Sequence, residues 1–194
     1  MASKRVGVLA LQGDFEAHQL ALERAGAVAV PVRTAADLES IDGLVIPGGE
    51  STTMLRIMLD EGLFEPLRQF GERKPIFGTC AGAILLASEV SHPTQASLGL
   101  VSLGVERNAY GRQLDSRIVK LAPEPEAAAQ MGAGELEAVF IRAPIIRKTG
   151  PGSKVYLRYR GDPVLVGEGR HLVATFHPEL SGDPRVHRVF LERL

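Results

Sequence analysis

The sequence predicts an α/β fold, a doubly wound and mostly parallel sheet with an added antiparallel or mixed extension. Two observations support this prediction. In the first ninety residues, short apolar runs alternate with segments of helical spacing, a pattern typical of parallel strands buried under helices on both faces of a sheet. In the second half, short apolar runs are separated by Gly, Pro and charged residues, which favours antiparallel or mixed strands.

The elements of the first half follow in regular order. Strands are predicted at residues 6–11, 28–32, 44–46 and 75–77. Helices are predicted at residues 14–25, 51–60, 66–72 and 81–90. Because ligands of doubly wound sheets bind beyond the carboxyl ends of the strands, the loops after these strands are the expected place for chemistry.

The second half is predicted to add six strands, at residues 98–105, 118–121, 138–142, 154–159, 164–166 and 171–176. A last helix is expected over residues 185–194, with Asp183 as its N-cap and Pro184 at its first position, where the fixed φ of proline fits. We expect all 194 residues to form a single domain, 1–194, with a core large enough to need no disulfide or metal.

Composition excludes several classes of function. The chain is 45% hydrophobic and 23% charged, and its net charge of −1 gives no basic surface for nucleic acid or an anionic membrane. A single cysteine excludes an internal disulfide and a cysteine-based metal cluster. The apolar run after Lys4-Arg5 is too short for a signal peptide, and no stretch approaches the roughly 20 apolar residues of a membrane span. We therefore expect a cytoplasmic protein.

Cys80 lies in the pentapeptide Gly-Thr-Cys-Ala-Gly (residues 78–82), between an apolar run and a helix-like run. A tight, glycine-flanked turn from strand to helix pushes a side chain into the open. The following helix N-terminus favours the thiolate form of a cysteine. We predict that Cys80 is a nucleophile; the alternative is a small buried hydrophobe.

His177 follows an apolar strand in the segment Thr-Phe-His-Pro-Glu (residues 175–179). A thiol nucleophile needs a base and a group that orients the base. Glu179 can accept a hydrogen bond from one imidazole nitrogen and leave the other facing the thiol. The remaining histidines have no such context and are predicted to be surface or helix-face residues: His18, His92, His171 and His187.

A second chemical signal is the segment Pro-Gly-Gly-Glu-Ser-Thr-Thr (residues 47–53), which follows the third strand. A diglycine turn can aim the N–H of Gly49 at a developing oxyanion, and Ala81 N–H would supply the other donor. The alternative is a plain strand-to-helix turn with Ser51 or Thr52 as N-cap. A phosphate-binding loop is disfavoured, because no lysine follows these glycines.

Pro-Gly-Gly, Gly-x-Cys-x-Gly and a late His-x-Glu, in this order, resemble the class I, triad-type glutamine amidotransferases. The resemblance implies a flavodoxin-like fold and hydrolysis of L-glutamine to L-glutamate and ammonia. It is closest to the glutaminase subunits of pyridoxal 5′-phosphate synthases, which serve vitamin B6 biosynthesis. The resembling segments spread over nearly the whole chain: 11–13 with Glu16 and His18, 47–53, 77–82, 105–108, 111–113, 140–144 and 175–180.

By this resemblance, Cys80 is the nucleophile, His177 is general base and then acid, and Glu179 orients His177. The resemblance also implies contacts to glutamine from these residues: Gly49, Glu50, Ser51, Arg107, Ile141 and Arg142. It implies no metal or cofactor, and a partner synthase subunit that is a (β/α)₈ barrel and receives the ammonia. The chain departs from the subfamily at Ile145, where a histidine is expected.

Other interpretations stay open at this point. A cysteine peptidase or related thiol hydrolase on the same fold would place a carboxylate close to the nucleophile turn and would not need Glu179. An inactive amidotransferase-like regulatory subunit would typically lack the cysteine or the histidine. Arg107 and Arg142 are also consistent with ordinary surface salt bridges, which contribute little to stability.

Overall fold

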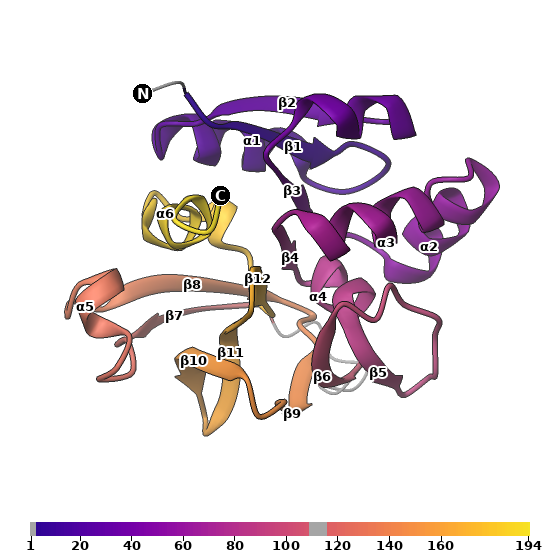
Figure 1. The fold of residues 1–194 in the computed structure, drawn as a ribbon. Helices are drawn as coiled ribbons and strands as arrows, with labels where there is room; N and C mark the ends of the chain where they lie inside the picture. Colours follow the sequence, from indigo (N-terminus) through magenta and orange to yellow (C-terminus); the bar gives the residue numbers. More distant parts are fainter. Residues whose placement is uncertain (1–2, 109–115) are drawn as a thin grey trace.

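A computed structural model describes residues 3–108 and 116–194 (Figure 1). The N-terminal half contains β1 (Arg5–Leu9), α1 (Phe15–Arg24), β2 (Val28–Val32), the 3₁₀ helix η1 (Ala35–Ser40), β3 (Gly43–Ile46), α2 (Ser51–Asp60), α3 (Phe64–Arg73), β4 (Ile76–Thr79) and α4 (Ala81–Leu86). The rest contains β5 (Ala87–Ser91), β6 (Val101–Glu106), β7 (Ser116–Leu121), α5 (Ala128–Met131), β8 (Leu136–Ile141), β9 (Ile145–Lys148), β10 (Ser153–Tyr159), β11 (Asp162–Glu168), β12 (His171–Ala174), η2 (Pro178–Leu180) and α6 (Arg185–Leu191).

The central sheet has seven strands in the order β10-β11-β12-β4-β3-β1-β2. The five strands from β12 to β2 are parallel to their neighbours, whereas β10 and β11 extend one edge in antiparallel fashion. A three-stranded sheet (β5-β6-β9) and a two-stranded sheet (β7-β8) complete the fold. This arrangement confirms the predicted α/β fold with a mostly parallel sheet and a mixed extension.

Helices cover the central sheet on both faces. Successive side chains of each strand point to opposite faces of the sheet, so the apolar residues of one strand pack into both layers. In β3 and β4, Ile46 and Ile76 pack with α2, α3 and α4, while Val45 and Phe77 pack with α1 and α6. Figure 1 shows α2, α3 and α4 together on one side of the sheet, and α6 and α5 on the other. Burial on two faces explains why these strands are continuous apolar runs.

The helix predicted at residues 81–90 is wrong beyond residue 86. The chain leaves the helix there and forms β5, which pairs in parallel with β6. The last carbonyls of α4 accept hydrogen bonds from the segment between β5 and β6: Leu98 N–H donates to Leu85 O, and Leu100 N–H donates to Leu86 O. An apolar run next to a helix is ambiguous by periodicity alone, and pairing with a distant strand decides it.

Three further details differ from prediction. Strand β9 was not predicted, although Ile145 and Ile146 are buried where β9 pairs with β6. The short helix α5 was not predicted either. At the last helix, Pro184 rather than Asp183 is the N-cap residue, and the helix begins at Arg185. The Asp183 carboxylate still accepts a hydrogen bond from Arg185 N–H at 2.9 Å, so its capping role is kept one position away.

Four neighbouring strands of the sheet, β12, β4, β3 and β1, end on the same side. The loops after them contain His177, Cys80, Gly48 and Gln12. The topology therefore brings the predicted chemical segments to one edge of the sheet. Within the described residues, no helix is long and apolar enough to span a membrane.

Candidate active site

Cys80 occupies a strained turn between β4 and α4. Its φ is +49° and its ψ is −103°, a region that residues other than glycine rarely adopt. The turn is held by a hydrogen bond from Cys80 N–H to Ala174 O of β12, at 2.9 Å. The thiol is 7% exposed, and its Sγ lies 3.9 Å from Ile141 O. Strain fixed by surrounding hydrogen bonds is typical of a positioned reactive group.

The glycines around Cys80 are required by close backbone approach. A Cβ on Gly78 would lie 2.5 Å from Gly82 O, and a Cβ on Gly82 would collide with Ile46 O of β3. Only glycine allows α4 to start so close to β3 and β4. The Gly-x-Cys-x-Gly pattern therefore has a steric cause at both of its glycines.

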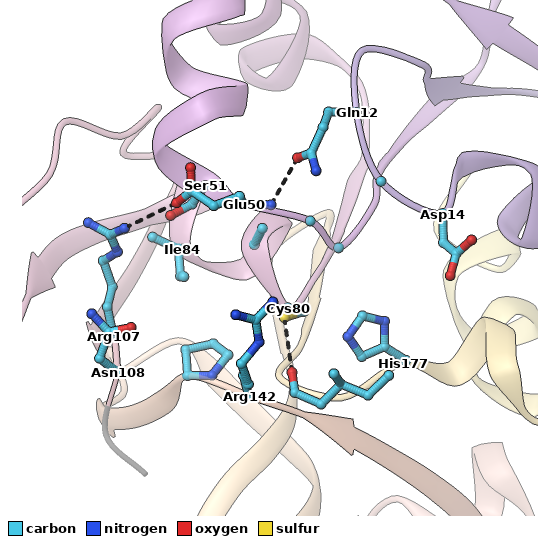
Figure 2. Close-up of a pocket in the computed structure, with 16 residues that line it drawn as sticks. Gln12, Asp14, Glu50, Ser51, Cys80, Ile84, Arg107, Asn108, Arg142 and His177 are labelled. Atoms are coloured by element: carbon cyan, nitrogen blue, oxygen red, sulfur yellow. Dashed lines mark hydrogen bonds and ion pairs between the residues drawn. The ribbon is translucent and has the colours of Figure 1, made fainter. Parts of the chain in front are cut away.

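His177 and Glu179 follow β12 and form a buried pair. His177 Nδ1 lies 2.7 Å from Glu179 Oε1, and the Glu179 side chain is fully buried. The backbone of His177 is fixed by a hydrogen bond from its N–H to Val139 O of β8, at 2.8 Å. Because Glu179 occupies Nδ1, the other ring nitrogen is free to serve the thiol, and Figure 2 shows the imidazole beside Cys80.

The surroundings of His177 favour its protonated form. Burial alone lowers the pKa of His177, but hydrogen bonds to Cys80 and Glu179, together with the charges of those two groups, raise the pKa to about 10. An imidazole with this pKa takes up the proton of the thiol readily. The arrangement can therefore generate a nucleophile and hold the released proton beside it.

Gly48 packs directly against this pair. A Cβ at position 48 would lie 2.5 Å from His177 Cε1 and 3.3 Å from Cys80 Cβ. We expect Gly48→Ala to displace the imidazole and to lower kcat of the glutamine hydrolysis that the sequence resemblance implies by roughly 100-fold, since small misplacements of catalytic groups have effects of that size. Steady-state glutamate release checks this. Gly152→Ala serves as the matched control, because nothing lies within 4 Å of a Cβ there and its backbone is outside the left-handed region; equal activity of the two variants would contradict the prediction.

A cavity of about 440 Å³ opens above Cys80 and His177. Its wall includes all the predicted site residues except Glu179, which lies deeper: Gly49, Glu50, Ser51, Cys80, Ala81, Arg107, Ile141, Arg142 and His177. It also includes residues to which no role had been assigned: Gln12, Gly13, Asp14, Gly48, Ile84, Asn108 and Pro144. The segment 111–113, which contributes to the family resemblance, lies outside the described residues.

Glu50 rather than Ser51 or Thr52 caps α2. Its carboxylate accepts hydrogen bonds from Thr52 N–H at 3.1 Å and Thr53 N–H at 2.7 Å. Burial opposes the charge on Glu50, but these bonds lower the pKa of its carboxyl below the usual value. Ser51 is buried, and its hydroxyl donates to Gln95 Oε1 at 3.0 Å. The carboxylate of Glu50 is therefore an anion fixed at the cavity wall.

The loop after β1 lies against the diglycine turn. Gln12 Oε1 accepts a hydrogen bond from Glu50 N–H at 2.9 Å (Figure 2). Gly13 has a φ of +92°, and a Cβ there would collide with Gly48 O. The two loops thus meet backbone to backbone. Ala81, the first residue of α4, carries one of the N–H groups that a helix leaves without an internal acceptor.

The two arginines of the site differ in environment. Arg107 is 9% exposed, and its guanidinium lies 2.8 Å from Thr52 Oγ1 and 3.7 Å from Glu50 Oε1. Arg142 is exposed at the cavity mouth with a φ of +43°. Arg107 therefore does not form an ordinary exposed salt bridge, whereas the charge of Arg142 lies at the mouth of the cavity (Figure 2).

The prediction of surface or helix-face positions is wrong for His171, which is buried in β12, whereas His18 and His187 do lie on helix faces, but buried ones. His18 and His187 have no exposed surface, and His171 is 7% exposed; only His92 is exposed. His18 lies on α1 and His187 on α6, so both are on helices, but on the faces that pack on the sheet. A histidine on an amphipathic helix does not indicate which face it occupies, so sequence reasoning missed these positions.

These buried histidines predict acid sensitivity. Burial is the main cause that lowers the pKa of His187 and of His171 to about 4, and it lowers the pKa of His18 as well. Between pH 6.5 and 5 the unfolded chain takes up protons that the native protein excludes, so stability present above pH 6.5 is lost as pH falls. Each histidine contributes a slope of up to about 1.4 kcal/mol per pH unit in the free energy of unfolding. The raised pKa of His177 has the opposite effect: it stabilises the native state below pH 6.5, and this stability is lost as pH rises toward 10, so His177 causes no loss on acidification.

Urea unfolding at pH 7, 6 and 5 measures this loss. His171→Asn should reduce the slope by one histidine's share, because Asn can still accept the hydrogen bond that Ile76 N–H donates to His171 Nδ1 at 3.2 Å. An unfolding free energy that does not change over this range would contradict the assignment of three neutral buried histidines.

Comparison with known proteins places this site in a family. The model of the SNO glutamine amidotransferase family matches residues 8–194. The chain is 59% identical to the pyridoxal 5′-phosphate synthase subunit PdxT of Solibacter usitatus, over 98% of this chain and 100% of that protein. It is 53% identical to the protein of the same name from Koribacter versatilis, over 97% and 94% of the two chains.

A solved crystal structure of a glutamine amidotransferase superposes with a TM-score of 0.87 and 46% identity, covering 97% of each chain. The matched residues 8–194 include the loops after β1, β3, β4 and β12, which contribute to the cavity wall. The chain therefore belongs to the SNO glutamine amidotransferase family.

Proposed function

We propose that this enzyme is the glutaminase subunit of a pyridoxal 5′-phosphate synthase, and that it hydrolyses L-glutamine with a Cys80-His177-Glu179 triad. The observation that supports this most directly is the Cys80 thiol beside the His177 imidazole at the base of the cavity, with His177 Nδ1 2.7 Å from the buried carboxylate of Glu179. Relatives at 59% and 53% identity over nearly the full chain carry the name of a subunit of that synthase.

The reaction begins when Cys80 gives its proton to His177 and attacks the side-chain carbonyl carbon of glutamine. The S–C bond forms, and the carbonyl oxygen becomes an oxyanion near the N–H groups of Gly49 and Ala81. When the intermediate collapses, the C–N bond breaks and the nitrogen takes the proton from His177, leaving as ammonia. His177 then accepts a proton from water, which attacks the thioester carbonyl carbon. The C–S bond breaks, glutamate leaves, and His177 returns the proton to the Cys80 sulfur, which restores the thiol.

The cavity wall offers complementary charges for a free amino acid. The α-carboxylate of glutamine would pair with Arg107 or Arg142, and its α-ammonium with the carboxylate of Glu50. Ser51 and Ile141 would line the path of the side chain toward Cys80. Such a set selects a small zwitterion over a peptide, which favours glutamine hydrolysis over a peptidase.

Ammonia becomes ammonium in water, so the product needs a shielded path to a second active site. We infer that the partner is a synthase subunit with a (β/α)₈ barrel, and that the two act in the cytoplasm. The loop of Gln12 and Gly13 lies at the cavity and holds Glu50 N–H. Docking of the partner on this loop would complete the oxyanion hole, and the free subunit would then be poorly active.

Glutamate release from glutamine tests the proposal, measured for the purified chain alone and with a pyridoxal 5′-phosphate synthase subunit. We expect release to rise with the partner. Equal rates with and without the partner would rule out activation by docking. No release under either condition, from a folded protein, would overturn the glutaminase and favour a regulatory amidotransferase-like subunit.

A further inference from the structure

The carboxylate of Glu179 has two oxygens, and the triad uses only one. Oε1 lies 2.7 Å from His177 Nδ1. Oε2 is buried, and within the described part of the chain it has no hydrogen bond of good geometry. Its polar neighbour is His18 Nε2, at 3.3 Å. A buried carboxylate oxygen without a donor is costly, so this neighbour needs an explanation.

His18 reaches this point from α1 and is itself fully buried. Its Nε2 lies between Glu179 Oε2 and Thr79 Oγ1, which is 3.0 Å away. Its Nδ1 lies 3.1 Å from His187 Nε2 of α6. Phe77 stands edge-on to both imidazoles and closes the space around them. A continuous polar chain thus extends from the triad into the core, through His18 to His187.

The tautomers of this chain follow from hydrogen-bond accounting. His187 Nδ1 is buried and has no partner in the described structure. If His18 donated from Nδ1 to His187, then His187 Nδ1 would carry an orphan buried N–H, and a lone pair of His18 would face the Glu179 carboxylate. If His187 donates from Nε2 to His18, only an acceptor lone pair stays unpaired, and His18 Nε2–H points at two oxygens. The second arrangement is favoured, since buried N–H groups without partners are rare.

We propose that His18 is a positioning residue of the active site: it shares its Nε2–H between Thr79 Oγ1 and Glu179 Oε2, and His187 fixes the tautomer that makes this possible. The inference rests on the proposed function of the triad. A shared hydrogen bond holds the carboxylate in the orientation that aims Oε1 at His177.

The charge balance agrees with this role. Burial and the facing His187 and His177 lower the pKa of His18, so His18 stays neutral while His177 takes the proton. The titratable groups that face His18 are His187 from α6, together with His177 and Glu179 after β12. His18 therefore donates to the Glu179 carboxylate as a neutral imidazole, and the positive charge stays on His177.

Two polar substitutions test the roles of the two ring nitrogens of His18 separately. In His18→Gln the amide reaches the place of Nε2 and can still donate to Glu179. In His18→Asn the shorter amide reaches only the place of Nδ1 and contacts His187. We expect His18→Gln to stay within about threefold of the parent. We expect His18→Asn to lower kcat roughly 10- to 100-fold with KM unchanged, the range for losing a hydrogen bond to a charged group.

The acid limb of kcat/KM is the second readout. In His18→Asn the Glu179 carboxylate is no longer held toward His177 and stabilises the imidazolium less, so His177 accepts the thiol proton less readily and the limb should move to higher pH by about one unit. The assays use the chain with its synthase partner. His171→Asn is the matched control, because it changes another buried histidine, in β12, whose ring nitrogen contacts Ile76 N–H instead of the triad. This control should keep the parent profile.

The pH dependence of Cys80 alkylation by iodoacetamide tests the role of His18 independently of glutamine hydrolysis. Cys80 is the only cysteine, so alkylation of this chain reports its reactivity directly. An upward shift of the alkylation limb in His18→Asn but not in His18→Gln supports the positioning role even if no glutamine is hydrolysed. Equal profiles for the two variants, whether both active or both impaired, would overturn it, because the side chain would then act only through packing.

Discussion

Cys80→Ala is expected to abolish glutamine hydrolysis, with a loss in kcat on the order of 10⁴-fold or more, as for removal of a nucleophile from other triads. The substitution removes one sulfur atom and leaves the turn intact, because alanine and cysteine have similar backbone preferences at φ +49°. The cavity wall that would hold glutamine is unchanged. Glutamine should therefore still bind, and calorimetry on the variant can measure its affinity without turnover.

The controls for this variant are its stability and its assembly with the partner. A melting temperature close to that of the parent shows that the turn still folds, and gel filtration with the synthase subunit shows that docking is kept. Residual activity within tenfold of the parent would remove Cys80 from the reaction and leave it as a packing residue of the β4–α4 turn.

Glu179→Gln is expected to lower kcat by roughly 10³- to 10⁴-fold with little change in KM, the range for loss of the charged member of a triad. A neutral amide does not stabilise the imidazolium of His177. The pKa of His177, raised to about 10 by Cys80 and Glu179, should fall, so His177 accepts the thiol proton less readily. The pH dependence of Cys80 alkylation measures this change, and steady-state kinetics separate kcat from KM.

Glu135→Gln is the matched control, since it makes the same chemical change at a position that is exposed and outside the cavity wall. A small effect of Glu179→Gln, within about threefold, would reduce the triad to a Cys80–His177 pair. That result would favour the thiol-hydrolase alternative, which has no need of Glu179.

The alternation of short apolar runs and helical spacing was enough to predict the fold of the first half. Strands covered on both faces have to be apolar throughout, and helices have to be apolar on one side, so the two patterns differ within a few residues. The central strands and α1, α2 and α3 were predicted close to their observed bounds. The error at residues 87–90 arose because this apolar run is compatible with either a helix or a strand. Only its pairing with β6 shows that it is a strand.

The sequence alone predicted which residue types would carry the proposed chemistry. A lone cysteine between two glycines, a histidine two residues before a glutamate and a diglycine turn are local patterns with local causes, such as the close approach of Gly82 to β3. Their positions after strands also predicted that they would meet. The roles of single side chains in the cavity wall were harder to predict from the sequence. For example, the carboxylate of Glu50 caps α2, a role that the sequence had suggested for Ser51 or Thr52.

Only the tertiary structure decided what stands behind the triad. His18 and His187 are 169 positions apart on two different helices, yet Nδ1 of His18 and Nε2 of His187 are 3.1 Å apart behind Glu179. A helical pattern specifies that one face is buried, but which face and against which neighbour depends on how α1 and α6 pack on the sheet. Burial then makes each ring neutral and fixes its partner, because a buried polar group keeps only the hydrogen bonds that packing brings within reach.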